Sequence, residues 1–165
     1  MYRTLFRHRL AIVALSLGVT LADVHAGETA DPAGAFAIGV AAFNAGRFDA
    51  AMESFEAASA AMPQNAEYQH WLGRAYGRLA EQSSWLAAMD LARKTCAAFE
   101  RAYALDPNDA ATIEDLIEYY TEAPPFLGGS PEKAEAMKRR LETLKQGGAQ
   151  TVAAEPPQVN PVQSR

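Results

Sequence analysis

The residues most suited to chemistry are four acids in one short stretch of the chain. They are Glu114, Asp115, Glu118 and Glu122. Glu114, Glu118 and Glu122 recur every fourth residue, so in a helix they share one face. Paired carboxylates can exchange protons as general acid and base, or bind a divalent cation. The same pattern is typical of a helix face in contact with water, and we expect that simpler role here.

No second catalytic pattern accompanies the acids. The sequence lacks a glycine-rich phosphate loop, a Gly-x-Ser-x-Gly nucleophile turn and a His-Glu-x-x-His pair. Its single cysteine, Cys96, excludes an intrachain disulfide, a cysteine-based zinc site and an iron–sulfur cluster. We expect Cys96 to be a buried apolar side chain, with an intermolecular disulfide or a reactive thiol as the alternatives. The sequence therefore predicts no enzyme, no catalytic residues, no cofactor and no metal.

The N-terminus has the pattern of a secretory signal peptide. Basic residues between positions 3 and 9 precede an apolar run from Leu10 to Leu21, and Val24-His25-Ala26 follows. We predict cleavage between Ala26 and Gly27, hence a periplasmic or secreted protein that is soluble after cleavage. The alternative is an N-terminal membrane anchor, although the run is shorter than the ~20 residues that span a bilayer.

Charge limits the range of partners. The formal net charge is −5, and loss of the leader, with three arginines and one aspartate, makes it −7. An acidic chain lacks the positive field that attracts nucleic acid, so we exclude that partner. Cleavage also leaves His70 as the one histidine, which excludes metal sites built from two histidines.

The elements that would position these side chains form an internal repeat. Similar residues recur at constant spacing, and the first two sets begin 34 residues apart, at Ile38 and Leu72. A phenylalanine, an alanine and a proline also recur at spacings of 3 and then 5. The matched positions are Ile38, Gly39 and Ala42; Leu72, Gly73 and Tyr76; Leu116, Ile117 and Tyr120; Phe55, Ala58 and Pro63; and Phe99, Ala102 and Pro107.

These spacings resemble the tetratricopeptide repeat, a 34-residue helix–turn–helix unit. The resemblance implies an all-α fold: a short solenoid of about three antiparallel helix pairs that forms a right-handed superhelix. After a short segment at 27–31, the pairs would occupy about 32–65, 66–109 and 110–146 of a domain spanning 32–146. The first repeat matches closely, the second matches at its ends, and the third matches in its first helix.

Local signals support close-packed helix pairs independently of the family. Gly39 and Gly73 lie inside helical patterns, where glycine is tolerated when a neighbouring helix passes close by. Phe55 and Phe99 are the bulky residues expected to fill the space between the pairs.

The helix boundaries carry their own signals. Proline at 63 and 107 lies just past a predicted helix end. Asn65 and Asp109 follow the two prolines and are expected to cap the next helices.

Two insertions distinguish this chain from a regular repeat. Ten extra residues in the second repeat extend an apolar stripe, which predicts an elongated helix from about 85 to 105, roughly 31 Å long. We expect its first turns to pack on neighbouring helices, with an exposed binding prong as the alternative. The stripe comprises Trp85, Met89, Ala92, Cys96, Phe99 and Tyr103.

The second insertion is a proline- and glycine-rich loop at 124–131. Phe126 and Leu127 in this loop must either tuck into the core, which we favour, or face a partner. Trp85 and Met89 are a natural docking site for them. A final helix at about 131–146 and a disordered tail at 147–165 complete the predicted organisation.

In the tetratricopeptide resemblance, the first helix of each pair lines a concave groove. An extended peptide would place an apolar side chain on Phe36, Val40 and Phe43, and a carboxylate on Arg74 or Arg78. For the arginines we favour the alternative, in which they pair with Glu118 and Glu114 across adjacent helices. The groove residues are Phe36, Val40, Phe43, Asn44, His70, Arg74, Arg78, Glu114, Glu118 and Thr121.

The sequence therefore predicts a non-catalytic protein–protein interaction module, an adaptor or assembly factor of the cell envelope. Its partner would be a protein or peptide, held in the groove or at the long helix and loop through Trp85, Met89, Phe126 and Leu127. A structural subunit that self-associates, with an empty groove, is the first alternative, and both accounts are compatible with a homo-oligomer. A small enzyme or ligand carrier that uses the acidic helix is the second.

Overall fold

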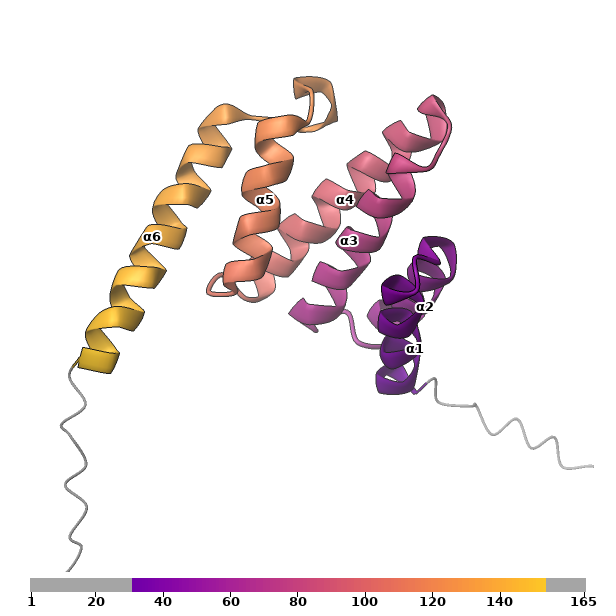
Figure 1. The fold of residues 1–165 in the computed structure, drawn as a ribbon, viewed down its shortest axis with the longest axis horizontal. Helices are drawn as coiled ribbons and strands as arrows, with labels where there is room; N and C mark the ends of the chain where they lie inside the picture. Colours follow the sequence, from indigo (N-terminus) through magenta and orange to yellow (C-terminus); the bar gives the residue numbers. More distant parts are fainter. Residues whose placement is uncertain (1–30, 154–165) are drawn as a thin grey trace, which may run out of the picture.

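The computed structural model describes residues 31–153, and all regular structure within them is helical (Figure 1). The prediction of an all-α fold is thus confirmed. The elements are α1 (Pro32–Asn44), α2 (Phe48–Ala61), α3 (Ala66–Glu81), α4 (Trp85–Leu105), α5 (Ala110–Glu122), the short 3-10 helix η1 (Pro125–Leu127) and α6 (Pro131–Ala153). The predicted signal peptide at 1–26, most of the segment at 27–31 and the tail from 154 onward lie outside the described residues.

Each helix packs on the next one along the chain, from α1 against α2 to α5 against α6. Figure 1 shows the result as a row of helices in chain order, in which α3 and α5 run in the same direction. Both of these helices begin with the expected cap: Asn65 accepts a hydrogen bond from the Tyr68 N–H at 3.1 Å, and Asp109 accepts one from the Thr112 N–H at 3.0 Å. Each cap satisfies a backbone donor that the helix itself leaves free.

The core depends on two glycines that allow close approach between helices. A Cβ atom at Gly39 would lie 2.6 Å from the Phe55 ring, and one at Gly73 would lie 2.5 Å from the Phe99 ring. Both rings are buried, so each phenylalanine of the second helix in a pair fills the space that a glycine of the first leaves open. This is the role expected for both glycines.

A second contact recurs between consecutive pairs. The Tyr76 hydroxyl on α3 donates to Glu56 on α2 at 2.6 Å, and the Tyr120 hydroxyl on α5 donates to Glu100 on α4 at 2.8 Å. Each glutamate precedes its tyrosine by 20 residues. Burial, reinforced by the glutamate partner, raises the pKa of both tyrosines, so the hydroxyls remain donors. The two junctions are therefore built alike.

Glu100 also receives a hydrogen bond from outside its pair. The Lys133 ammonium at the start of α6 donates to Glu100 Oε1 at 2.8 Å. This hydrogen bond, opposed in part by burial and assisted by the Tyr120 hydroxyl, holds the pKa of Glu100 below its usual value. One carboxylate thus links α4, α5 and α6.

The elongated helix α4 has the predicted bounds, but the expectation that its first turns are covered is wrong. Trp85 is 72% exposed and Leu86 is 74% exposed, whereas Met89 is half-buried. The reason is the length of the neighbouring helix. Tyr119, near the end of α5, contacts the Ala92 carbonyl, so the first two turns of α4 extend beyond the level of Tyr119.

The loop and the C-terminal helix also differ from expectation. Phe126 is 65% exposed, so the expected tucking holds for the half-buried Leu127 and is wrong for Phe126. Cys96 is buried as expected, beside Gly128 of the loop. Helix α6 continues to Ala153 instead of ending near residue 146, because two glycines weaken a helix without ending it and no proline follows before Pro156.

The close approach at Gly73 can be tested against a matched glycine one turn later. Gly73→Ala places a Cβ against the Phe99 ring, so we expect the free energy of unfolding to fall by about 1–3 kcal/mol. Gly77→Ala meets Thr95 at an ordinary 3.6 Å and gains helix propensity, so it should raise that free energy by up to ~1 kcal/mol. Urea unfolding followed by circular dichroism measures both, and equal effects would contradict the assignment.

The link through Glu100 predicts a pH dependence. Because its pKa is lower in the folded chain, the carboxylate stabilises the fold above the ordinary glutamate value of about 4.3, and this contribution is lost as the pH falls through the lowered value. We expect Glu100→Gln and Lys133→Met to be less stable than wild type near neutral pH and to approach it in acid. The exposed Glu142→Gln serves as control. A stability deficit in Glu100→Gln that does not change with pH would disprove the link.

Candidate functional site

An open groove with a volume of about 420 Å³ lies between α3 and α5. Helix α4 forms its floor, and the loop at η1 closes one end. Most of its charged side chains come from the two walls, and most of its apolar side chains come from the floor and the loop. The lining residues are Phe43 of α1; Arg74, Gly77, Arg78, Ala80 and Glu81 of α3; Ala92, Thr95 and Phe99 of α4; Asp115, Glu118, Tyr119 and Glu122 of α5; and Ala123, Pro124 and Leu127.

The groove brings together five of the residues predicted from the sequence to bind a partner. Phe43, Arg74, Arg78 and Glu118 line it as groove residues, and Leu127 joins them from the loop.

Other selected residues lie elsewhere. Phe36 and Val40 pack against the core, where the Phe36 ring stacks on Tyr68 with centroids 4.6 Å apart. Asn44, Glu114, Thr121, Trp85 and Phe126 are exposed outside the lining, and Met89 is half-buried there.

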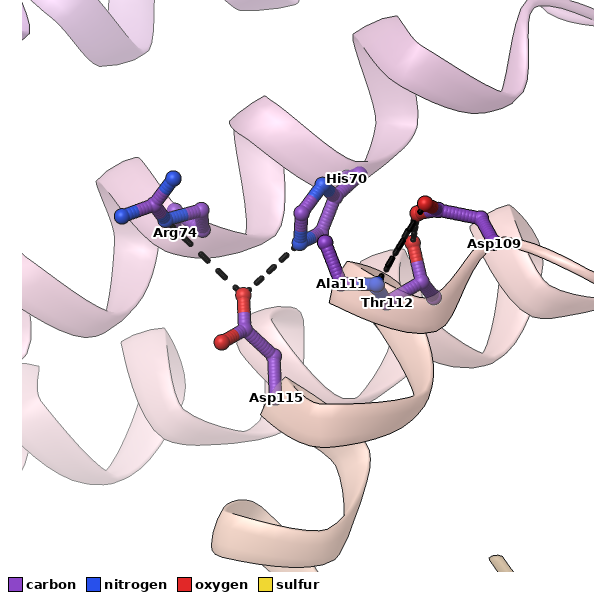
Figure 2. Close-up of polar contacts among 6 residues, drawn as sticks. All are labelled: His70, Arg74, Asp109, Ala111, Thr112 and Asp115. Atoms are coloured by element: carbon purple, nitrogen blue, oxygen red, sulfur yellow. Dashed lines mark hydrogen bonds and ion pairs between the residues drawn. The ribbon is translucent and has the colours of Figure 1, made fainter. Parts of the chain in front are cut away.

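Asp115 joins the two walls (Figure 2). His70 of α3 is buried, and its Nε2 donates a hydrogen bond to Asp115 Oδ2 of α5 at 2.7 Å. Arg74 Nε lies 3.8 Å from the same oxygen. We expected a histidine that faces the groove, whereas His70 is buried and does not line it, and its contact with Asp115 helps to fix the spacing of α3 and α5.

Both arginines of the groove already have partners. Arg74 stacks over the Trp71 ring at 4.8 Å and the Phe43 ring at 5.3 Å, in addition to its contact with Asp115. Arg78 donates to Glu81 at 2.7 Å. The expected pairing of these arginines with Glu118 and Glu114 is therefore wrong, since their acidic partners are Asp115 and Glu81. Glu114 instead lies 3.6 Å from Lys145 of α6.

Glu118 and Glu122 form the unpaired part of the groove. Both are exposed, and within residues 31–153 neither takes part in an ion pair or a side-chain hydrogen bond. The same part of the chain holds no group of three or more His, Cys, Asp or Glu residues suited to a metal ion. Glu118 and Glu122 are thus the acids of the groove that no side-chain contact within the described residues occupies.

Tyr119 closes the end of the groove. Its hydroxyl lies 2.8 Å from the Ala92 carbonyl of α4 and 2.7 Å from the Leu127 carbonyl, so one hydrogen serves both acceptors. Burial, with the nearby Cys96 and Glu100 adding to it, raises the pKa of Tyr119 to about 12, so it remains a donor. The loop is thereby fixed to the groove floor.

Sequence reasoning did not place Tyr119, Glu81 or Glu122 in the groove. For Glu122 the signal was present, since it lies one turn beyond Glu118 on the same face. For Tyr119 and Glu81 the placement depends on the length of the helices and on the loop, which no local spacing specifies.

Comparison with known protein families assigns this chain to a family. Residues 39–155 match the model of a family described as the TRAP transporter T-component. The chain belongs to this family. No curated protein matches it. The family is described as a component of a transporter.

The family match corrects the tetratricopeptide assignment. The chain matches the T-component model, and the tetratricopeptide resemblance was wrong as a statement of family. The residues that carried the resemblance do mark closely packed helix pairs. A glycine that faces a phenylalanine and a proline after a helix end are typical of such pairs in general. Such spacing therefore does not separate one family of helix pairs from another.

The match also corrects the predicted role and location. The family is described as a component of a transporter and not as a general adaptor of the cell envelope, and the match lends no support to the alternative of a self-associating structural subunit. The prediction of a free periplasmic or secreted protein is wrong for the same reason, because the family is assigned to a transporter, which acts at a membrane. Between residues 31 and 153 no helix of this T-component combines the length and the apolar character that a membrane crossing requires.

The contact between His70 and Asp115 gives a stability prediction. Asp115→Ala leaves a buried histidine donor without its acceptor, so we expect the free energy of unfolding to fall by about 1–3 kcal/mol. Asp115→Asn keeps an acceptor and should cost less. The matched variant is Glu118→Ala, one turn along the same helix, which removes an unpaired side chain and should change stability by less than ~0.5 kcal/mol. Equal losses for the two alanine variants in urea unfolding would contradict the role of Asp115.

Proposed function

We propose that this chain is an accessory subunit of a TRAP transporter and that it acts by binding another subunit of the same transporter. The observation that carries the proposal is the family match over residues 39–155. The described groove supports a binding role, since its polar groups are either paired with each other or open to a ligand.

We further propose that α1 to α6 form a short α-solenoid of three helix pairs. The support is the recurrence of the same contacts along the chain: a glycine against a phenylalanine within the first two pairs, and a tyrosine hydroxyl on a glutamate between consecutive pairs. Stacked pairs of this kind present the first helices of the pairs side by side. The groove between α3 and α5 would then lie on the concave face.

A second surface would contribute contacts outside the groove. Trp85 and Leu86 at the start of α4, and Phe126 in the loop, are large apolar side chains exposed by 72%, 74% and 65%. Exposed aromatic side chains supply much of the binding energy in protein interfaces. These residues support a protein partner in preference to a small solute.

Capture from the native membrane tests the proposed function. The tagged chain is expressed in its own cells, crosslinked, and purified from detergent-solubilised membranes, and the captured proteins are identified by mass spectrometry. We expect subunits of a TRAP transporter to be enriched over a tag-only control, and deletion of the gene to lower uptake by that transporter. Capture of unrelated proteins without transporter subunits would refute the proposal.

A further inference from the structure

We propose that the groove between α3 and α5 binds an extended segment of the partner subunit that carries basic and apolar side chains. A lysine or arginine of this segment lies between Glu118 and Glu122, and an apolar side chain lies on the groove floor. The inference rests on the proposed function for the identity of the partner. It adds the chemistry of the segment and the residues that recognise it.

The first argument is the balance of charge in the groove. Arg78 is hydrogen-bonded to Glu81, and Arg74 lies against Asp115, so these four charges are matched within the walls. Glu118 and Glu122 remain, and they leave the groove with two uncompensated negative charges. A carboxylate on a ligand would be repelled there, whereas a cation would be attracted. The sequence alone had suggested the opposite, a carboxylate held by Arg74 or Arg78.

The second argument is the direction of the two walls. Helices α3 and α5 run the same way in Figure 1, and they end at Glu81 and Glu122, which both line the groove. The C-terminus of a helix carries partial negative charge because its last carbonyl groups have no partner in the helix. Two such ends at one end of the groove add to the negative potential of the carboxylates.

The third argument is the floor. The Phe99 ring, the Ala92 methyl and the half-buried Leu127 give it an apolar surface. Gly77 in the wall leaves this floor open, since a Cβ atom at that position would have Thr95 as its sole neighbour within 4 Å. A volume of about 420 Å³ suits a few side chains of an extended segment and excludes a folded domain. Glu118 and Glu122 stand above this floor one turn apart, where they can flank one ammonium or guanidinium group.

Peptide binding tests the chemistry directly. The probe is a fluorescein-labelled peptide that alternates leucine and lysine, and the matched peptide has glutamate in place of lysine. Fluorescence anisotropy with the purified chain should show binding of the lysine peptide, weakened by added salt, and no comparable binding of the glutamate peptide. Failure of the lysine peptide to bind, or equal binding of the two, would overturn the proposal.

Two double variants locate the binding. Glu118→Gln with Glu122→Gln should weaken binding of the lysine peptide roughly three- to tenfold, the size expected for two exposed ion pairs. Glu53→Gln with Glu142→Gln makes the same change in net charge on exposed residues of α2 and α6 and should leave binding unchanged. Equal weakening in both would show that net charge, and not the groove, attracts the peptide.

The same variants in the membrane capture separate this inference from the proposed function. If the unchanged chain captures transporter subunits and the Glu118/Glu122 variant captures them equally well, the function stands and the groove proposal fails. If the unchanged chain captures no transporter subunits, the proposed function is contradicted, and so is the assignment of the bound segment to a partner subunit. We expect capture by the unchanged chain and by the Glu53/Glu142 control, and reduced capture by the groove variant.

Discussion

The structure depends on how closely its paired helices can approach each other. At Gly39 and Gly73 the absence of a side chain admits a phenylalanine ring from the second helix of the pair, at distances that a Cβ atom would not tolerate. This contact sets the separation of α1 from α2 and of α3 from α4. Because Phe55 and Phe99 are buried by the same contact, it also determines where the core of each pair lies. The tyrosine–glutamate hydrogen bonds then join one pair to the next.

The groove is a consequence of the same packing. The Phe99 ring that fills the space at Gly73 also forms part of the groove floor, so the fold and the site share one side chain. Asp115 contacts both His70 and Arg74 of the opposite wall, and it thereby fixes the width of the groove and neutralises one of its cations. The groove is therefore negative because both of its arginines are paired with acids of the groove walls, which leaves Glu118 and Glu122 uncompensated. The unpaired carboxylates are those that no structural contact requires.

The all-α fold, the bounds of α4, the caps at Asn65 and Asp109 and the role of the glycines could be predicted from sequence, since each depends on residues close together in the chain. The partner of Arg74 could not, because several carboxylates of α5 lie along the facing helix and the choice of Asp115 depends on the rotation of α5 relative to α3. The pair of Arg78 with Glu81 lies within α3, whereas the prediction from sequence concerned partners on the adjacent helix only. The exposure of Trp85 depends on how far α4 extends beyond the level of Tyr119 in α5. Family membership was mistaken because packing signals are common to many helix-pair proteins, and the proposed chemistry of the groove could be stated only after its charges had been matched in three dimensions.

The double contact of Tyr119 bears on how a bound segment can be oriented. Since one hydroxyl fastens the loop at Leu127 to the carbonyl of Ala92, the groove has a fixed wall at this end. A bound chain that runs along the groove toward this wall would have to stop or bend at the tyrosine. The site would thus distinguish a chain terminus or a turn from an uninterrupted strand, and its selectivity would include length and polarity as well as charge.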